Sequence, residues 1–215
     1  MTERLYDKDA YLQEFVAGVI SCEPDGKGYQ VILDKTAFYP EGGGQPGDMG
    51  TLEAESLVTA VLDVQQKNGD ILHLCAEAVP PGTKVKGRID WKRRITHMRE
   101  HSGEHILSGI LCERYGLHNI GFHMGKEYVT IDFDGLLTWE QLDIAQELAN
   151  AKVLENVEIE AGYPTEEVLD ILAYRSKKEI SGPVRIVKIP GADVCACCGT
   201  HVRRTGEVGP IRIIA

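Results

Sequence analysis

The chain has 215 residues, of which 43% are hydrophobic, and its formal net charge at pH 7 is −10. This length and hydrophobic content fit one large or two modest packed domains, and the acidic balance argues against a protein coated in basic surface for long nucleic acids. No apolar run approaches the roughly 20 residues that span a bilayer, and the acidic start MTERLYDKDAYLQEF lacks the apolar core of a leader peptide, so we expect a soluble cytoplasmic protein without membrane contact.

Short strands separated by turn signals dominate residues 1–90. The turn signals EPDGKG, KNGD and PPG place glycine, proline and asparagine between runs of β-branched or alternating residues. We therefore expect a small β-barrel or β-sandwich in this part of the chain. The predicted strands are AGVISCE, YQVILDKTAFY, GTLEAESLVTAVLDVQQ, DILHLCAE and TKVKGRID.

Helical spacing begins at Trp91 and mixes with strands from there on. Residues 91–116 have apolar side chains at roughly helical intervals and end in a glycine, and Thr138 with Gln141 forms a capping-box pair at the start of a second helix. The sequence predicts an α+β fold, with a small N-terminal β-barrel-like domain over residues 1–90 and an α/β two-layer domain over residues 91–215. Further strands are expected in YVTIDFDG, VEIEAGY, PVRIVKI and GPIRIIA, and a short helix in TEEVLDILA.

A basic segment lies at the junction of the two parts. Residues 84–99 hold seven lysines and arginines, with Asp90 as the only acid. Two interpretations carry equal weight: a solvated helix start beside a strand, or a patch that contacts phosphates. The residues that would make phosphate contacts are Lys92, Arg93, Arg94 and Arg99.

Two pairs of metal-ligand residues have the same spacing. His101 and His105 stand four residues apart on the predicted helix, so both imidazoles project from one face and can reach one cation at about 2 Å. Cys197 and His201 are also four residues apart, with Gly199 between them and strand-like sequence on either side, which indicates a tight turn. Together they form a nitrogen and sulfur set suited to zinc.

Other interpretations of these motifs stay open on the residues alone. The cysteine cluster DVCACCGTH could form a redox couple, although the usual dithiol motif is C-x-x-C at a helix start. It could instead be a closed structural zinc knuckle or a group of inert buried thiols. HSGEH also matches the inverted zinc-protease motif H-x-x-E-H, with Glu104 as the general base.

Three motifs, in order, resemble one family. RRITHMREHSGEHILSG and CCGTHVRRTGEVGPIRII resemble the editing domain of alanyl-tRNA synthetases and its free-standing AlaX-type relatives, and TAFYPEGGGQPGDMG resembles the glycine-rich loop of the same family. HSGEH is more similar to the free-standing type. The resemblance implies that residues 91–215 form the editing domain and that zinc is held by His101, His105, Cys197 and His201. The spacing to His201 favours Cys197 over Cys195 or Cys198.

The resemblance also implies an activity. The expected reaction is deacylation of mischarged tRNA(Ala), chiefly seryl-tRNA(Ala) with glycyl-tRNA(Ala) as a second candidate, and the expected partner is the tRNA(Ala) acceptor end. Zinc would act as Lewis acid, water activator or substrate anchor. A zinc metalloprotease and an RNA-binding module with structural zinc remain alternatives, and the oligomeric state is not readable. Candidate substrate-binding residues are Gly43, Gly44, Gln45, Thr200 and His123.

Overall fold

The structure is a computed structural model that describes residues 1–26, 28–55, 57–176 and 182–214. It contains two compact units, Met1–His97 and Met98–Ala215. Helix α2 (Trp91–Tyr115) contributes residues to each of them. Among the described helices, none is both long enough and apolar enough to cross a membrane.

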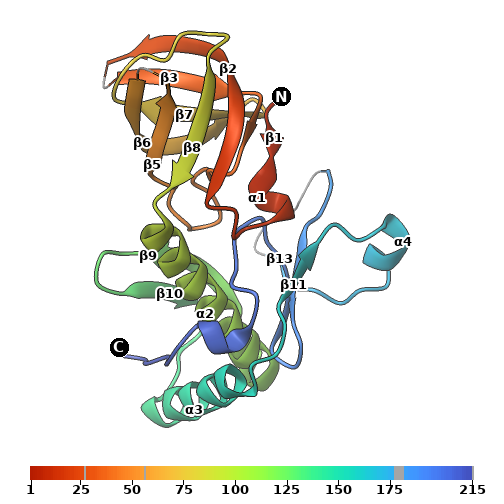
Figure 1. Ribbon diagram of the computed structural model, residues 1–215. Helices are drawn as coiled ribbons and strands as arrows, with labels where there is room; N and C mark the ends of the chain where they lie inside the picture. Colours follow the sequence, from red (N-terminus) through yellow and green to blue (C-terminus); the bar gives the residue numbers. More distant parts are fainter. Residues whose placement is uncertain (27, 56, 177–181, 215) are drawn as a thin grey trace. The chain divides into compact units, whose positions relative to one another are not determined.

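A closed β-barrel dominates the first unit (Figure 1). Its strands are β2 (Glu14–Asp25), β3 (Gly28–Leu33), β5 (Gly50–Ala54), β6 (Leu57–Lys67), β7 (Asp70–Cys75) and β8 (Lys84–Ile89). They follow the order β2-β3-β7-β6-β5-β8, and antiparallel pairing of β8 with β2 closes the barrel. The small elements β1 (Glu3–Arg4), α1 (Leu5–Lys8) and β4 (Lys35–Thr36) complete the unit. The predicted β-barrel is thus confirmed.

Alternating apolar side chains fill the barrel interior. Phe15 on β2 and Val85 on β8 are buried with side chains from the other strands in one hydrophobic cluster. Gly87 allows the two strands to pack this closely, because a Cβ atom there would lie 2.4 Å from the Phe15 ring. At the β6–β7 hairpin, Asn68 and Gly69 have φ angles of 52° and 87°, as a two-residue hairpin turn requires. The predicted KNGD turn is confirmed.

A buried histidine stands in the barrel core. The His73 side chain donates from Nδ1 to the Val31 carbonyl oxygen at 3.0 Å and accepts at Nε2 from the Thr36 hydroxyl, whose oxygen lies 2.8 Å away. That hydroxyl oxygen in turn accepts from the Phe38 amide at 3.1 Å. A neutral imidazole satisfies this network, whereas a second proton on Nε2 would require the Thr36 hydroxyl to stop donating to His73. Burial lowers the pKa of His73 to about 4, against a smaller opposing effect of the Val31 carbonyl.

We expect His73 to make the protein less stable in acid. The unfolded chain binds a proton on this histidine below its ordinary pKa of 6.5, whereas the folded chain does so only near pH 4. The free energy of unfolding should therefore fall by about 3 kcal/mol as the pH drops through this window. Urea unfolding at pH 7 and pH 4.5 measures the loss, and His73→Gln is the control, since it should lose correspondingly less. An equal loss in both proteins would contradict the prediction.

The second unit combines helices with two small sheets (Figure 1). Strands β9 and β10 form an antiparallel hairpin, and β11, β12 and β13 form a three-stranded sheet in that order. The predicted α+β character of the chain is confirmed. Beyond α2, the elements are β9 (Asn119–Met124), β10 (Val129–Phe133), α3 (Trp139–Glu155), β11 (Glu160–Gly162), α4 (Glu166–Leu169), β12 (Ile186–Ile189), β13 (Asp193–Ala196) and η1 (Thr205–Glu207).

The predicted capping box of α3 is confirmed, and the predicted last strand is wrong. Thr138 Oγ1 accepts from the Gln141 amide at 3.2 Å, and Gln141 Oε1 accepts from the Thr138 amide at 2.9 Å.

Residues 209–214, where the last strand was predicted, pair with no strand. Instead the Asn150 side chain of α3 donates to the Ile211 carbonyl and accepts from the Ile211 amide, each at 2.8 Å. A side-chain amide thus replaces the strand partner that the alternating sequence led us to expect. The helix predicted over residues 165–173 is shorter, covering only Glu166–Leu169.

Candidate metal centre

Helix α2 presents two buried histidines to the same side. His101 and His105 are separated by one helical turn, and their ring centroids lie 5.3 Å apart. Both side chains are almost fully buried. The predicted helix therefore brings the first two candidate ligands together, as the four-residue spacing requires.

The turn after β13 presents a cysteine and a histidine. The Gly199 amide donates to Cys197 Sγ at 3.3 Å, which stabilises negative charge on the sulfur. Arg185 holds the same turn by donating from Nη1 to the carbonyl oxygens of Cys197 and Gly199, at 3.0 and 2.9 Å. The Cys197 amide returns a bond to the Arg185 carbonyl at 3.0 Å. The turn is thus fixed before any ligand binds.

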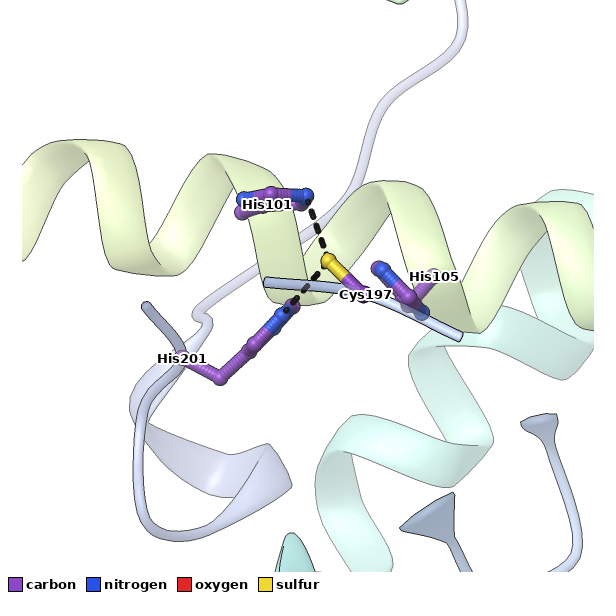
Figure 2. A group of neighbouring side chains, drawn as sticks. All are labelled: His101, His105, Cys197 and His201. Atoms are coloured by element: carbon purple, nitrogen blue, oxygen red, sulfur yellow. Dashed lines mark hydrogen bonds between the residues drawn. The ribbon is translucent and has the colours of Figure 1, made fainter. Parts of the chain in front are cut away.

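These four side chains converge on one point (Figure 2). Cys197 Sγ lies 3.5 Å from His101 Nε2 and 3.6 Å from His201 Nε2. With a ring nitrogen of His105, all four candidate ligand atoms lie within 4.8 Å of one another. Three imidazoles and one thiol that close together can hold a metal ion.

Gly199 is required by the fit of the turn against α2. A Cβ atom at this position would lie 2.1 Å from Cε1 of His101 and 2.4 Å from its Nδ1. Any other residue would therefore displace the imidazole or the turn. This close approach to His101 explains the glycine between Cys197 and His201, and a left-handed backbone conformation is not the reason for it.

The electrostatics of the set favour a thiolate at Cys197 and a neutral imidazole at His201. Burial raises the pKa of Cys197, but charge and hydrogen bonding from His101 and His105 outweigh it and hold this pKa well below its ordinary value of 9.0. Burial, with the charge of His101, lowers the pKa of His201 to about 3. A deprotonated thiol and a neutral imidazole are the forms that bind a metal.

Nδ1 of His105 and Nδ1 of His201 contact different kinds of side chain, a charged carboxylate and a neutral hydroxyl. His105 Nδ1 lies 2.8 Å from Asp193 Oδ2, and His201 Nδ1 lies 3.2 Å from Ser102 Oγ. Both contacts leave Nε2 facing the set. Sequence reasoning missed both partners. For Asp193 the only signal was its place at the start of DVCACCGTH, and Ser102 gave none beyond its position inside HSGEH.

The structure separates the three neighbouring cysteines. Cys195 is buried and belongs to a second group of candidate ligand atoms with His105 and Asp193, whereas Cys198 is exposed and belongs to neither group. Burial raises the pKa of Cys195 to about 11, so this thiol stays protonated. Of the three, Cys197 alone is placed among the described residues to bind the same metal as His101 and His201.

The Glu104 carboxylate belongs to a buried network. Its Oε1 accepts from Ser108 Oγ at 2.7 Å and from Asn119 Nδ2, and Asn119 Nδ2 also donates to Ser108 Oγ at 3.1 Å. Helix α2 and the start of β9 are tied together by these bonds. The other oxygen, Oε2, lies 3.7 Å from His105 Nε2, so the carboxylate also borders the group of candidate metal ligands.

The predicted substrate-binding residues lie in different surroundings. Gly43 and Gly44 are exposed in the first unit, with φ angles of 61° and 85° that favour glycine. Gln45, next to them, is buried, and its amide and carbonyl exchange hydrogen bonds of 3.0 Å with Gly42. In the second unit Thr200 is buried, and His123 is exposed on β9.

The basic residues at the start of α2 are not equivalent. Lys92 and Arg99 are exposed, and Arg93 is partly buried and donates from Nε and Nη2 to the Gly47 carbonyl, each at 3.2 Å. Arg94 is fully buried and ion-paired with Asp48. A phosphate contact does not fit Arg94, because its guanidinium is already engaged inside the first unit, and we do not retain it in the predicted surface.

Comparisons with known proteins point to one functional class. Residues 11–93 match a family model described as class II (A) tRNA synthetases, and residues 184–215 match the threonyl and alanyl tRNA synthetase second additional domain. The alanyl-tRNA editing protein AlaX-L of Pyrococcus horikoshii is 37% identical over 100% of this chain and 54% of its own length. The alanyl-tRNA editing protein Aarsd1-A of Xenopus laevis is 35% identical over 96% of this chain and 53% of its own.

The chain is also similar to part of an aminoacyl-tRNA synthetase. The alanine-tRNA ligase of Methanobrevibacter smithii is 38% identical over 99% of this chain, which corresponds to 25% of the ligase. The chain spans about half the length of the editing proteins that it matches. Cys197 and His201 lie inside the segment that matches the second additional domain.

Proposed function

The chain belongs to the editing-domain family of alanyl-tRNA synthetases and alanyl-tRNA editing proteins, and from this premise we propose that it deacylates mischarged tRNA(Ala). The observation that carries the proposal is the buried set of His101, His105, Cys197 and His201, which converges within 4.8 Å. The substrate would be an ester between the wrong amino acid and the acceptor end of the tRNA. Seryl-tRNA(Ala) is the proposed main substrate, with glycyl-tRNA(Ala) as a second candidate.

Zinc is the metal that this set fits best. For tetrahedral zinc with ordinary bond lengths, a sulfur and a nitrogen ligand lie about 3.6 Å apart. The Cys197 sulfur lies 3.5 and 3.6 Å from the two nearest imidazole nitrogens. One soft thiolate with three imidazoles also excludes calcium and magnesium, which prefer oxygen ligands. When bound, zinc would supply a positive charge that polarises or anchors the ester.

Side chains around the set could select the substrate. A seryl ester differs from an alanyl ester by one hydroxyl, and a buried polar group that bonds this hydroxyl is left without a partner when alanine binds. Thr200 is buried and directly precedes His201, and it is a proposal for this contact. Gly43, Gly44 and Gln45 remain proposals for substrate binding, and so does His123.

The tRNA-binding surface is proposed for the exposed basic residues of α2. Lys92 and Arg99 are exposed, and Arg93 is partly exposed, so each can contact a phosphate. The two-domain division at residues 1–90 and 91–215 and the cytoplasmic location likewise remain predictions, consistent with a role in translation.

We expect purified protein to release serine from seryl-tRNA(Ala) at least about 100-fold faster than alanine from alanyl-tRNA(Ala), because the cognate ester lacks the hydroxyl that the site would bind. Release of labelled amino acid from both substrates and from glycyl-tRNA(Ala) measures the difference, with and without a chelator.

Two other outcomes would favour the alternatives. Tight tRNA binding without ester cleavage would favour an RNA-binding module with structural zinc. Peptide cleavage that is lost in Glu104→Gln would favour a metalloprotease. Equal release of serine and alanine would leave a deacylase that does not edit.

A further inference from the structure

We propose that Asp193 and Arg175 are positioning residues that orient His105 toward the metal and set the strength with which its imidazole binds it. The inference deepens the proposed function and rests on the metal site described above. Neither residue is among the four candidate ligands of that site.

The contact between Asp193 and His105 fixes the histidine tautomer. Asp193 Oδ2 lies 2.8 Å from His105 Nδ1, and both side chains are buried. A carboxylate accepts and does not donate, so the proton of the neutral imidazole must stay on Nδ1. The lone pair of Nε2 then faces the metal set, and the negative charge behind the ring makes Nε2 a stronger donor.

Arg175 holds the carboxylate in this position. Its Nε donates to Asp193 Oδ1 and its Nη2 to Asp193 Oδ2, both at 2.8 Å, in the two-pronged geometry that fits a guanidinium to a carboxylate. The backbone of Arg175 is also joined to β13, since its amide donates to the Val194 carbonyl and its carbonyl accepts from the Ala196 amide, each at 2.8 Å. The pair therefore cannot rotate away from His105 without breaking several bonds.

The paired hydrogen bonds from Arg175 to Asp193 also argue against a second metal ion beside His105. His105, Asp193 and Cys195 have candidate ligand atoms within 4.8 Å of one another. Both Asp193 oxygens, however, already accept from the positively charged Arg175. A cation there would compete with a guanidinium that is held through its own backbone, so the carboxylate serves His105 and leaves one metal site.

Gly109 allows the carboxylate to reach the helix. It lies one turn after His105 on α2, and a Cβ atom there would be 2.1 Å from the Ala192 carbonyl oxygen and 2.8 Å from Asp193 Cβ. The backbone before β13 thus packs directly against α2. This approach places Asp193 behind the His105 ring.

The contact of His201 with Ser102 can be compared with that of His105 with Asp193. Its Nδ1 lies 3.2 Å from Ser102 Oγ, a neutral hydroxyl, and the Val202 amide donates to the same oxygen at 3.2 Å. Ser102 can orient its imidazole as Asp193 does, but it adds no charge. Replacing each partner separates the effect of orientation from the effect of charge.

The test is zinc affinity in the full chain, measured by competition with a coloured chelator, together with the absorption spectrum of the Co²⁺ form. Asp193→Ala should weaken zinc binding about 10- to 100-fold, and Asp193→Asn, which keeps a hydrogen-bond acceptor, should weaken it less. Ser102→Ala should weaken it least. The Co²⁺ ligand-field bands should shift in the Asp193 variants while the thiolate-to-cobalt band from Cys197 persists.

Arg175 is tested by a conservative and a disruptive change. Arg175→Met should lower zinc affinity, and Arg175→Lys should restore part of it because the positive charge returns. Thermal unfolding of the metal-free proteins identifies variants that merely fold poorly. A shift in the Co²⁺ bands of a variant that unfolds like the wild type supports a positioning role, which general loosening of the fold would not produce.

Two results would overturn the proposal. One is wild-type zinc affinity in both Asp193 variants, and the other is an equal loss of affinity in Asp193→Ala and Ser102→Ala. Neither depends on catalysis. If the affinities change as expected but the wild type releases no serine from seryl-tRNA(Ala), the proposed function fails and the role of Asp193 stands.

Discussion

Replacing Cys197 with alanine is expected to remove the zinc that we propose for this site and, with it, the proposed deacylation of seryl-tRNA(Ala). Cys197 Sγ lies next to both His101 Nε2 and His201 Nε2, so it is central to the set, and it is the only ligand that brings a negative charge. Loss of an outer partner weakens metal sites about 10- to 100-fold, and loss of a direct ligand should exceed that range.

The measurement is zinc content after dialysis, followed by serine release under single-turnover conditions. Cys198→Ala and Cys195→Ala are matched controls in the same segment, since Cys198 is exposed and Cys195 lies with Asp193 behind His105. Both should retain one zinc per chain. Retention of zinc in Cys197→Ala, or its loss in Cys198→Ala, would assign the ligand to a different cysteine.

The metal set could be predicted from the sequence because its geometry is local within each half. Two histidines one helical turn apart must share a face, and a cysteine and a histidine around Gly199 must share a turn. Only the contact between the histidine pair of α2 and the turn with Cys197 and His201 is non-local. The resemblance to a known family predicted that contact. The comparisons with alanyl-tRNA editing proteins confirm that resemblance.

The residues that support the set could not be predicted, because their roles depend on contacts far apart in the chain. Arg175 meets Asp193 across 18 positions, and Asp193 meets His105 across 88. No periodicity marks such pairs. The predicted strand at residues 209–215 was wrong for a similar reason: the alternation is present, but the partner of Ile211 is the side chain of Asn150.

The largest departure from sequence reasoning is Arg94, where a basic run indicated a surface. Charged side chains are almost never fully buried unless they are paired, and Arg94 is paired completely. Its guanidinium bonds both oxygens of Asp48 and donates to the carbonyl oxygens of Ala10 and Ala37, at 2.8 and 2.6 Å. Asp48 also accepts from the Tyr39 amide at 2.6 Å. Arg94 therefore joins the end of the glycine-rich loop to α2.

Arg94→Met is accordingly expected to lower the free energy of unfolding by about 3 to 5 kcal/mol, because it leaves the Asp48 carboxylate buried without its counter-charge. Arg93→Met is the matched control, since the Arg93 side chain is partly exposed and its guanidinium donates to a single carbonyl oxygen, that of Gly47. Its change should therefore stay near about 1 kcal/mol. Urea unfolding of the two variants measures both. Adding Asp48→Asn to Arg94→Met should recover part of the loss, because a neutral amide is less costly to bury than a carboxylate. If Arg94→Met were instead as stable as wild type and bound tRNA more weakly, Arg94 would belong to the nucleic-acid surface and the burial argument would be wrong.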